Sequence, residues 1–125
     1  MPADPPAPLR LTRGMRLKQG RDFVRVKTQG KRLVCGCLIA NWLELPPGLP
    51  LRVGVITSRK VGEAVARNRA RRLLREAFRL HQHDLRCPVD LVLVARNSIV
   101  GMKLAGVEHD FLKALRQARL LKSTS

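Results

Sequence analysis

The spacing of apolar side chains along the chain predicts three helices. The longest runs from about residue 63 to about residue 83, and one arc of its helical wheel, drawn at about 100° per residue, is apolar throughout. That arc holds Ala66, Ala70, Leu73, Leu74, Ala77 and Leu80. A second amphipathic helix is predicted over residues 104–121. A shorter helix with a thin apolar stripe is predicted over residues 17–30, where Gly30 suits a C-terminal stop.

The segments between these helices have the composition of β-strands. Residues 32–45 are rich in β-forming side chains, and Gly36 predicts a bulge or a break into two strands. After a proline-rich turn, residues 51–58 alternate apolar and polar positions, and we expect a hairpin with the preceding strand. Residues 89–95 are almost continuously apolar, which is typical of a strand covered on both faces. The order α-β-β-(β)-α-β-α predicts an α+β fold, a two-layer sandwich of helices on a small sheet.

The ends of the chain differ from this central part. Residues 1–9 carry four prolines and predict a disordered tail, and residues 123–125 are expected to form a short C-terminal tail. Residues 10–122 then form one domain, a size that buries about two thirds of the surface of the unfolded chain. The sequence contains neither a signal peptide nor an apolar run near the roughly 18 residues of a membrane span. We therefore expect a cytoplasmic protein with no membrane partner.

Charge changes the interpretation of the longest helix. The chain carries 25 basic and 9 acidic residues, a formal net charge of +16. Every basic side chain of this helix is Arg, whose planar guanidinium matches phosphate oxygens in pairs. Between residues 59 and 79 only Glu63 and Glu76 offset the basic side chains, whereas helices that merely face solvent mix charges of both signs. This pattern predicts binding to a nucleic acid.

No group of side chains has the spacing of a catalytic or metal site. His81 and His83 stand beside Asp84, and His109 stands beside Asp110. His81 and His83 lie two residues apart at a helix end and do not face each other, which favours cations near the negative end of the helix over acid–base chemistry. The cysteines lack the paired spacing of a zinc site and are expected to be small buried side chains: Cys35, Cys37 and Cys87. We expect no catalytic residue and no metal ligand in the protein itself.

The central run resembles a known family. Residues 58–78, SRKVGEAVARNRARRLLREAF, resemble the signature of the bacterial ribonuclease P protein components, in which a Ser-basic-Lys-hydrophobic-Gly segment leads through Ala-Val and Arg-Asn-Arg into a basic helix. Residues 16–32, RLKQGRDFVRVKTQGKR, resemble the N-terminal helix of the family. Residues 89–99, VDLVLVARNSI, resemble its last strand and the loop that follows.

The resemblance implies a protein cofactor of the ribonucleoprotein endonuclease that removes the 5′ leader from precursor tRNA. It implies that the RNA subunit is catalytic and holds the Mg²⁺ ions, that there is no stable protein partner, and that the basic helix follows a left-handed crossover. Carried over by position, the residues that contact the RNA subunit are Arg59, Lys60, Arg67, Asn68, Arg69, Arg71, Arg72 and Arg75. The family holds the leader in a cleft between the N-terminal helix and the sheet. Phe23 is expected to line that cleft, and Trp42 is a second candidate.

This sequence departs from the family at the expected cleft. Lys27 stands where the family often has a second aromatic side chain, so a leader cleft here relies on cations and aliphatic side chains more than on stacking. Two other functions remain open for the same residues. One is a general or ribosomal RNA-binding protein with the same fold and no role in tRNA cleavage. The other is a DNA-binding module with its basic helix in a major groove.

Overall fold

The chain folds as an α+β domain, here a computed structural model that describes residues 10–17 and 19–122. Within these residues it forms three α-helices and four strands, in the predicted order. They are α1 (Gly20–Gln29), β1 (Lys31–Cys35), β2 (Leu38–Glu44), β3 (Arg52–Ile56), α2 (Ala64–His81), β4 (Val89–Ala95) and α3 (Leu104–Gln117). The tails predicted at residues 1–9 and 123–125 lie outside the described residues.

The four strands form one mixed sheet in the order β1-β2-β4-β3. The pairs β1/β2 and β2/β4 are antiparallel, and β3/β4 is parallel. The predicted hairpin between the strand ending near residue 45 and the strand beginning near residue 51 is therefore wrong, because β4 lies between β2 and β3. The physical reason is that β4 is apolar on both faces and takes the inner position, where both faces are covered.

The break predicted at Gly36 is confirmed. β1 and β2 form a hairpin in which Cys35 pairs with Leu38, leaving a two-residue turn at Gly36 and Cys37. Gly36 has a φ of 56°, which glycine adopts without steric cost. Asp110 of α3 fills the space beside it, because a Cβ on Gly36 would lie 2.2 Å from the Asp110 Oδ2 atom. The turn thus requires glycine for two reasons, the positive φ and the close approach of Asp110.

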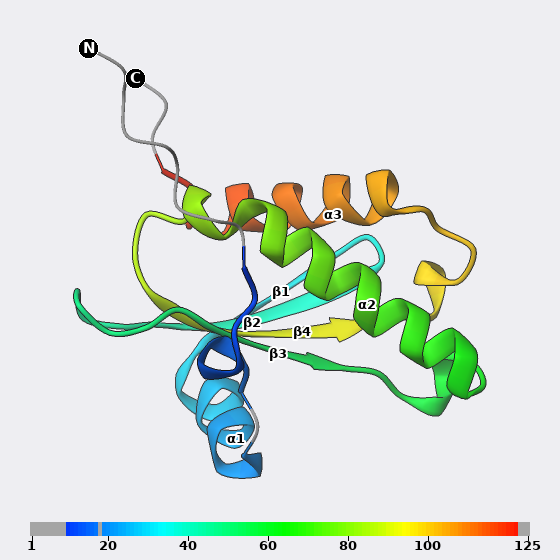
Figure 1. Cartoon of the computed structure of the whole chain (residues 1–125), viewed down its shortest axis with the longest axis horizontal. Coiled ribbons are helices and arrows are strands. Elements are labelled where there is room, and N and C mark those ends of the chain that lie inside the picture. Colours follow the sequence, from blue (N-terminus) through cyan, green and yellow to red (C-terminus); the bar gives the residue numbers. More distant parts are fainter. Residues whose placement is uncertain (1–9, 18, 123–125) are drawn as a thin grey trace.

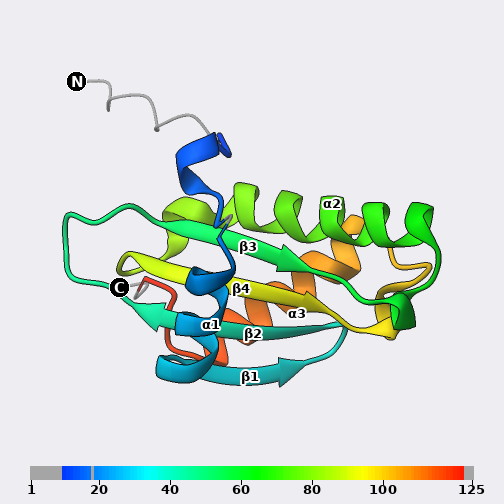
Figure 2. The same cartoon turned by 90° about the horizontal axis from the view of Figure 1, so that it is seen from below.

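Helices cover both faces of the sheet (Figures 1 and 2). α2 and α3 lie side by side on one face, and α1 crosses the other. The alternation of side chains along β4 serves both layers: Leu91 and Leu93 belong to the main core under α2 and α3, whereas Val92 packs with Val26 of α1. The helices bury apolar faces of the predicted kind, although α1 begins at Gly20 and α3 ends at Gln117, inside the predicted limits.

The path from β3 through α2 to β4 is left-handed. In Figure 2, which views the sheet from the α1 side with both parallel strands pointing right, β3 lies above β4 and α2 lies behind the sheet. This hand is the reverse of the usual rule for parallel crossovers, and it is the hand that the family resemblance implied. The crossover places α2 beside β3, which is an edge strand of the sheet.

Candidate nucleic-acid interface

The polar face of α2 carries a group of arginines that we call the arginine face. α2 buries Ala70, Leu74, Ala77 and Phe78 against the sheet, so the opposite side of the helix is directed to solvent. Within the part of the chain that the structure describes, no carboxylate forms an ion pair with the arginines of this face: Arg67, Arg69, Arg71, Arg72 and Arg75. The one acidic side chain inside α2, Glu76, pairs with Arg79 instead, 2.5 Å away.

Neutral groups hold two of these side chains in place. Arg71 donates one hydrogen bond to the Thr57 hydroxyl at 2.7 Å and another to the Asn68 side-chain oxygen. Arg69 points toward the segment before α3, where it donates to the Met102 carbonyl at 2.6 Å. These contacts orient the guanidinium groups without neutralising them, so the positive charge of the face remains available to an anion.

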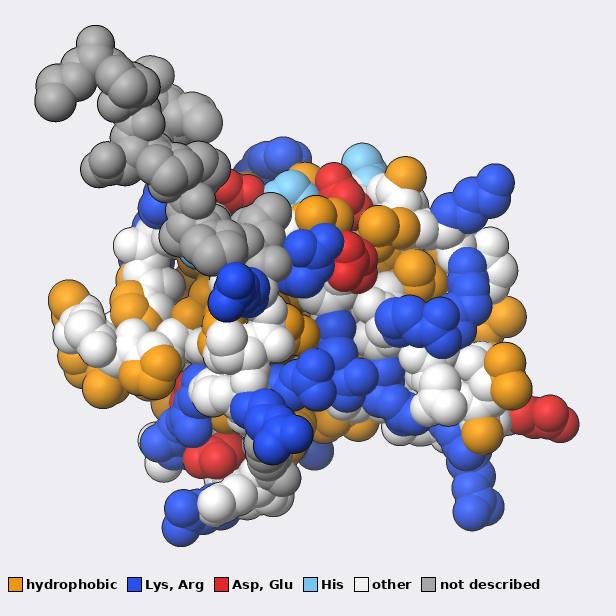
Figure 3. Space-filling model, viewed as in Figure 1, with side chains coloured by type: hydrophobic (Ala, Val, Ile, Leu, Met, Phe, Trp, Pro, Cys, Tyr) orange, Lys and Arg blue, Asp and Glu red, His pale blue; other side chains and the backbone are white. Residues whose placement is uncertain are grey.

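Arg59 and Lys60 extend this positive surface beyond α2. Both side chains are exposed in the short 3₁₀ helix η2 (Arg59–Val61), whose first turn is capped by the Ser58 hydroxyl accepting from the Lys60 backbone N–H at 3.3 Å. On the face shown in Figure 3, Lys and Arg side chains gather over the region where Figure 1 shows α2 and β3. The structure therefore places all the residues predicted to contact the RNA subunit on α2 and on η2, the short helix that precedes it.

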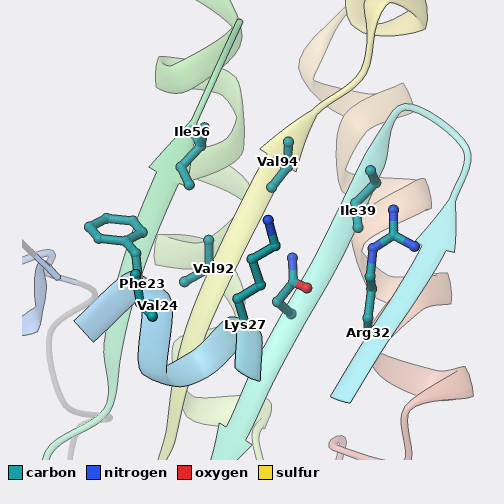
Figure 4. Close-up of a pocket in the computed structure, with 9 residues that line it drawn as sticks. Phe23, Val24, Lys27, Arg32, Ile39, Ile56, Val92 and Val94 are labelled. Carbon is teal, nitrogen blue, oxygen red and sulfur yellow. The ribbon is translucent and has the colours of Figure 1, made fainter. Parts of the chain in front are cut away.

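A cleft of about 370 Å³ lies between α1 and the sheet on the opposite layer. Its walls combine cationic and amide side chains with a set of apolar ones. The polar side chains are Lys27, Arg32 and Asn41. The apolar side chains are Phe23, Val24, Ile39, Ile56, Val92 and Val94. Figure 4 shows Phe23 projecting from α1 at one side of the strands that form the floor, Lys27 projecting from α1 over the middle of the floor, and Arg32 projecting from β1 at the other side.

A buried ion-pair network fixes α1 over this floor. The Asp90 side chain is fully buried on β4 and binds Arg25 of α1 and Arg52 of β3 at once. Arg52 donates to both Asp90 oxygens, at 2.9 and 2.8 Å, and this contact raises the pKa of Arg52. A second close contact lies beside the network, because Gly54 of β3 leaves room for the Phe23 ring: a Cβ there would lie 2.5 Å from Phe23 Cε1.

Of the two aromatic side chains predicted to line the cleft, the structure places only Phe23 there. Trp42 is 6% exposed and belongs to the main core on the α2 and α3 side of the sheet. The reason is strand alternation: Ile39 and Asn41 face the cleft, so Trp42, one residue on from Asn41, faces the other layer. Arg32 and Asn41 are cleft residues that the sequence did not reveal, and their parity on β1 and β2 was the available signal.

Of the histidines predicted to be helix-end cations, His81 lies in the last turn of α2 and also contacts α3. His81 lies 2.8 Å from Asp84 through Nδ1 and 3.3 Å from Glu108 of α3 through Nε2. No three His, Cys, Asp or Glu side chains among the described residues gather as metal ligands would. None of the helices in that part of the chain combines the length and apolar character needed to cross a membrane.

Comparisons with known proteins decide the family. The sequence profile of the family Ribonuclease P matches residues 11–119. The ribonuclease P protein component of Pelotomaculum thermopropionicum is 38% identical over 107 residues, covering 86% of this chain and 95% of that protein. The chain belongs to the ribonuclease P protein family. The ribonuclease P protein component of Desulfovibrio desulfuricans is 37% identical over 119 residues, with 92% of each chain covered.

Solved structures of ribonuclease P proteins share this fold. The Staphylococcus aureus RNase P protein superposes with a TM-score of 0.77 at 24% identity, over 86% of this chain and 98% of that one. The Thermotoga maritima RNase P protein gives a TM-score of 0.71 at 26% identity, over 82% and 96%. The chain is thus a protein subunit of ribonuclease P, an endoribonuclease, and it assists the 5′ processing of precursor tRNA. Membership of this family implies association with the ribonuclease P RNA.

Proposed function

We propose that this protein holds two RNAs on two surfaces. The arginine face, with Asn68 and the η2 cations, binds the catalytic RNA subunit, and the cleft under α1 binds the single-stranded 5′ leader of precursor tRNA. The residues assigned to the RNA subunit are Arg59, Lys60, Arg67, Asn68, Arg69, Arg71, Arg72 and Arg75. Residues 10–122 act as one RNA-binding domain, and we place this activity in the cytoplasm.

The observation that carries the proposal is the uncompensated charge of the arginine face. Cations four residues apart on a helix, such as Arg67 and Arg71, repel one another by about 0.2–0.5 kcal/mol per pair. No described carboxylate relieves this repulsion along the face. A phosphate backbone would relieve it, and guanidinium groups already oriented by neutral partners would lose little conformational freedom on binding.

The chemistry of the cleft suits a single strand. The Phe23 ring and the aliphatic side chains around it offer an apolar surface to the face of a base. Lys27 and Arg32 stand at the same cleft and can contact the phosphates between bases. With one aromatic side chain in its walls, the cleft favours contacts with the backbone and with aliphatic groups over extended stacking.

In this proposal the protein contributes binding, and the RNA subunit contributes the chemistry. Asp90, the one fully buried carboxylate among the described residues, is already paired with two arginines and so is a poor Mg²⁺ ligand. We assign the Mg²⁺ ions to the RNA subunit and no catalytic residue to the protein. The protein then acts by holding the substrate and by neutralising phosphate repulsion near the reaction centre.

Reconstitution tests this function. The protein is mixed with the RNA subunit of a bacterial ribonuclease P at a low Mg²⁺ concentration at which the RNA alone cleaves precursor tRNA slowly. We expect the protein to restore cleavage at the 5′ end of the mature tRNA. A general RNA-binding protein would bind both RNAs without stimulating cleavage, and that outcome would contradict the proposal.

A further inference from the structure

A second hollow lies at the edge of β3, between the cleft and the arginine face. It has a volume of about 230 Å³ and is lined by Arg16, by Arg75 of α2 and by the middle of β3. Phe23 lines both this hollow and the cleft under α1. The Phe23 side chain is therefore shared by the cleft and this hollow.

The two arginines of the hollow carry charge that no described group neutralises. Neither Arg16 nor Arg75 forms an ion pair with a carboxylate in the part of the chain the structure describes. Burial, together with the charges of Arg16 and Arg71, lowers the pKa of Arg75. The half-buried guanidinium of Arg75 thus sits in a positive field, and an anion in the hollow would remove an existing repulsion.

The backbone fixes Arg16 in this place. Arg16 forms an isolated parallel bridge with Val53 on the open edge of β3, and the Leu17 N–H donates to the Val53 carbonyl at 2.8 Å. The side chain of Arg16 remains exposed, so its guanidinium can reach an incoming ligand. Arg75 approaches from α2 on the other layer. Two separate parts of the chain therefore direct cations at one space.

We propose that the hollow between Arg16 and Arg75 binds one phosphodiester of the 5′ leader as that strand leaves the cleft over Phe23. This inference rests on the proposed function of the cleft and adds the path that the RNA leader follows after it leaves the cleft. The leader reaches the hollow because Phe23 lines both the hollow and the cleft. Arg75 lies at the border of the arginine face, so it contacts the leader here in addition to the RNA subunit, whereas Arg16 contacts the leader alone. The leader then crosses the edge of β3 toward α2, which brings the RNA next to the arginine face.

Neutral phosphate substitution tests the site. Precursor tRNAs are prepared in which single leader phosphodiesters are replaced, one at a time, by uncharged methylphosphonates, and their affinity for the reconstituted holoenzyme is measured. With the natural protein, one leader position should lose about tenfold in affinity, as expected for a charge-assisted hydrogen bond. In the Arg16→Gln protein the methylphosphonate at that leader position should cause little further loss of affinity. In the Arg16→Lys protein it should still cause part of the loss seen with the natural protein.

Arg116→Gln is the matched control, because it removes one exposed positive charge from α3, away from the hollow. It should respond to every methylphosphonate as the natural protein does. The inference is overturned if the methylphosphonates lower the affinity of Arg16→Gln for precursor tRNA as much as they lower that of the natural protein. It is also overturned if Arg16→Gln weakens binding of the RNA subunit in the absence of precursor tRNA. Failure of the proposed function looks different, since the natural protein would then bind leader-bearing and leaderless tRNA equally.

Discussion

At the scale of single residues, Asp90 shows how a buried charge can support a binding surface. It is fully buried, yet three of its contacts come from arginines of α1 and β3. A buried carboxylate needs such partners, because an isolated charge in the interior costs several kcal/mol. The network thereby connects α1, which covers the cleft, to the strands that form the floor of the cleft. The position of α1 depends on these ion pairs.

Asp90→Asn should therefore destabilise the fold. The amide keeps the shape of the carboxyl group but leaves Arg25 without its counter-charge and Arg52 with only the more distant Asp22, 4.0 Å away. Because both arginines are partly exposed, we expect a loss of about 2–3 kcal/mol in the free energy of unfolding, below the roughly 3–5 kcal/mol of a fully buried pair. Urea unfolding measures it. The control is Glu44→Gln, which breaks an exposed pair with Arg86 and should cost under about 1 kcal/mol; equal losses would contradict the role of Asp90.

Cys37 offers a second prediction at this scale. Burial, helped by the hydrogen bond and charge of Asp110, raises the pKa of Cys37 to about 12. Cys37 is 1% exposed, so at pH 8 its thiol should resist iodoacetamide in the native protein and react only after unfolding. Because the folded thiol keeps its proton above the usual value of 9.0, this group favours folding less as the pH rises from 9 toward 12. Peptide mass spectrometry checks the order of modification, and Cys37 reacting as fast as half-buried Cys87 would contradict it.

At the scale of elements, α2 was the most predictable part of the chain. Its sequence places small and apolar side chains on one arc and arginines on the other, and the helix forms over Ala64–His81 as that pattern requires. The position of β4 between β2 and β3 was not predictable, because strand order depends on pairing between residues far apart in sequence. Trp42 was misplaced for a related reason. A lone aromatic carries no sign of which face it occupies until the helices that cover each face are known.

The contact between α1 and β3 gives a prediction for an element. Gly54→Ala adds a Cβ that would lie 2.5 Å from Phe23 Cε1, so the ring and with it α1 must shift. We expect a loss of about 1–3 kcal/mol in stability and weaker binding of leader-bearing precursor tRNA, with affinity for the RNA subunit unchanged. Gly20→Ala is the control, since nothing lies within 4 Å of a Cβ there. Unchanged leader affinity in a destabilised Gly54→Ala protein would show that the position of α1 does not govern the cleft.

At the scale of the whole molecule, a net charge of +16 accompanies two positively charged surfaces with different shapes. Net charge alone attracts any polyanion and gives binding that weakens steeply with salt. The two surfaces differ in shape: the arginine face is an open helix surface, and the cleft is a confined hollow with one aromatic side chain in its walls. We propose that this difference in shape assigns a different RNA to each surface. The division requires that the two affinities can be lost separately.

The most direct test compares two double variants, each of which removes two positive charges. Lys27→Gln with Arg32→Gln alters the cleft, and Arg67→Gln with Arg72→Gln alters the arginine face. For each protein we would measure affinity for the RNA subunit and, in the holoenzyme, the ratio of affinities for leader-bearing and leaderless tRNA. The account predicts that the cleft variant loses about tenfold or more of the leader ratio and keeps its RNA-subunit affinity, while the helix variant does the reverse. Equal losses of both quantities in both variants would mean that net charge, and not two distinct sites, governs binding.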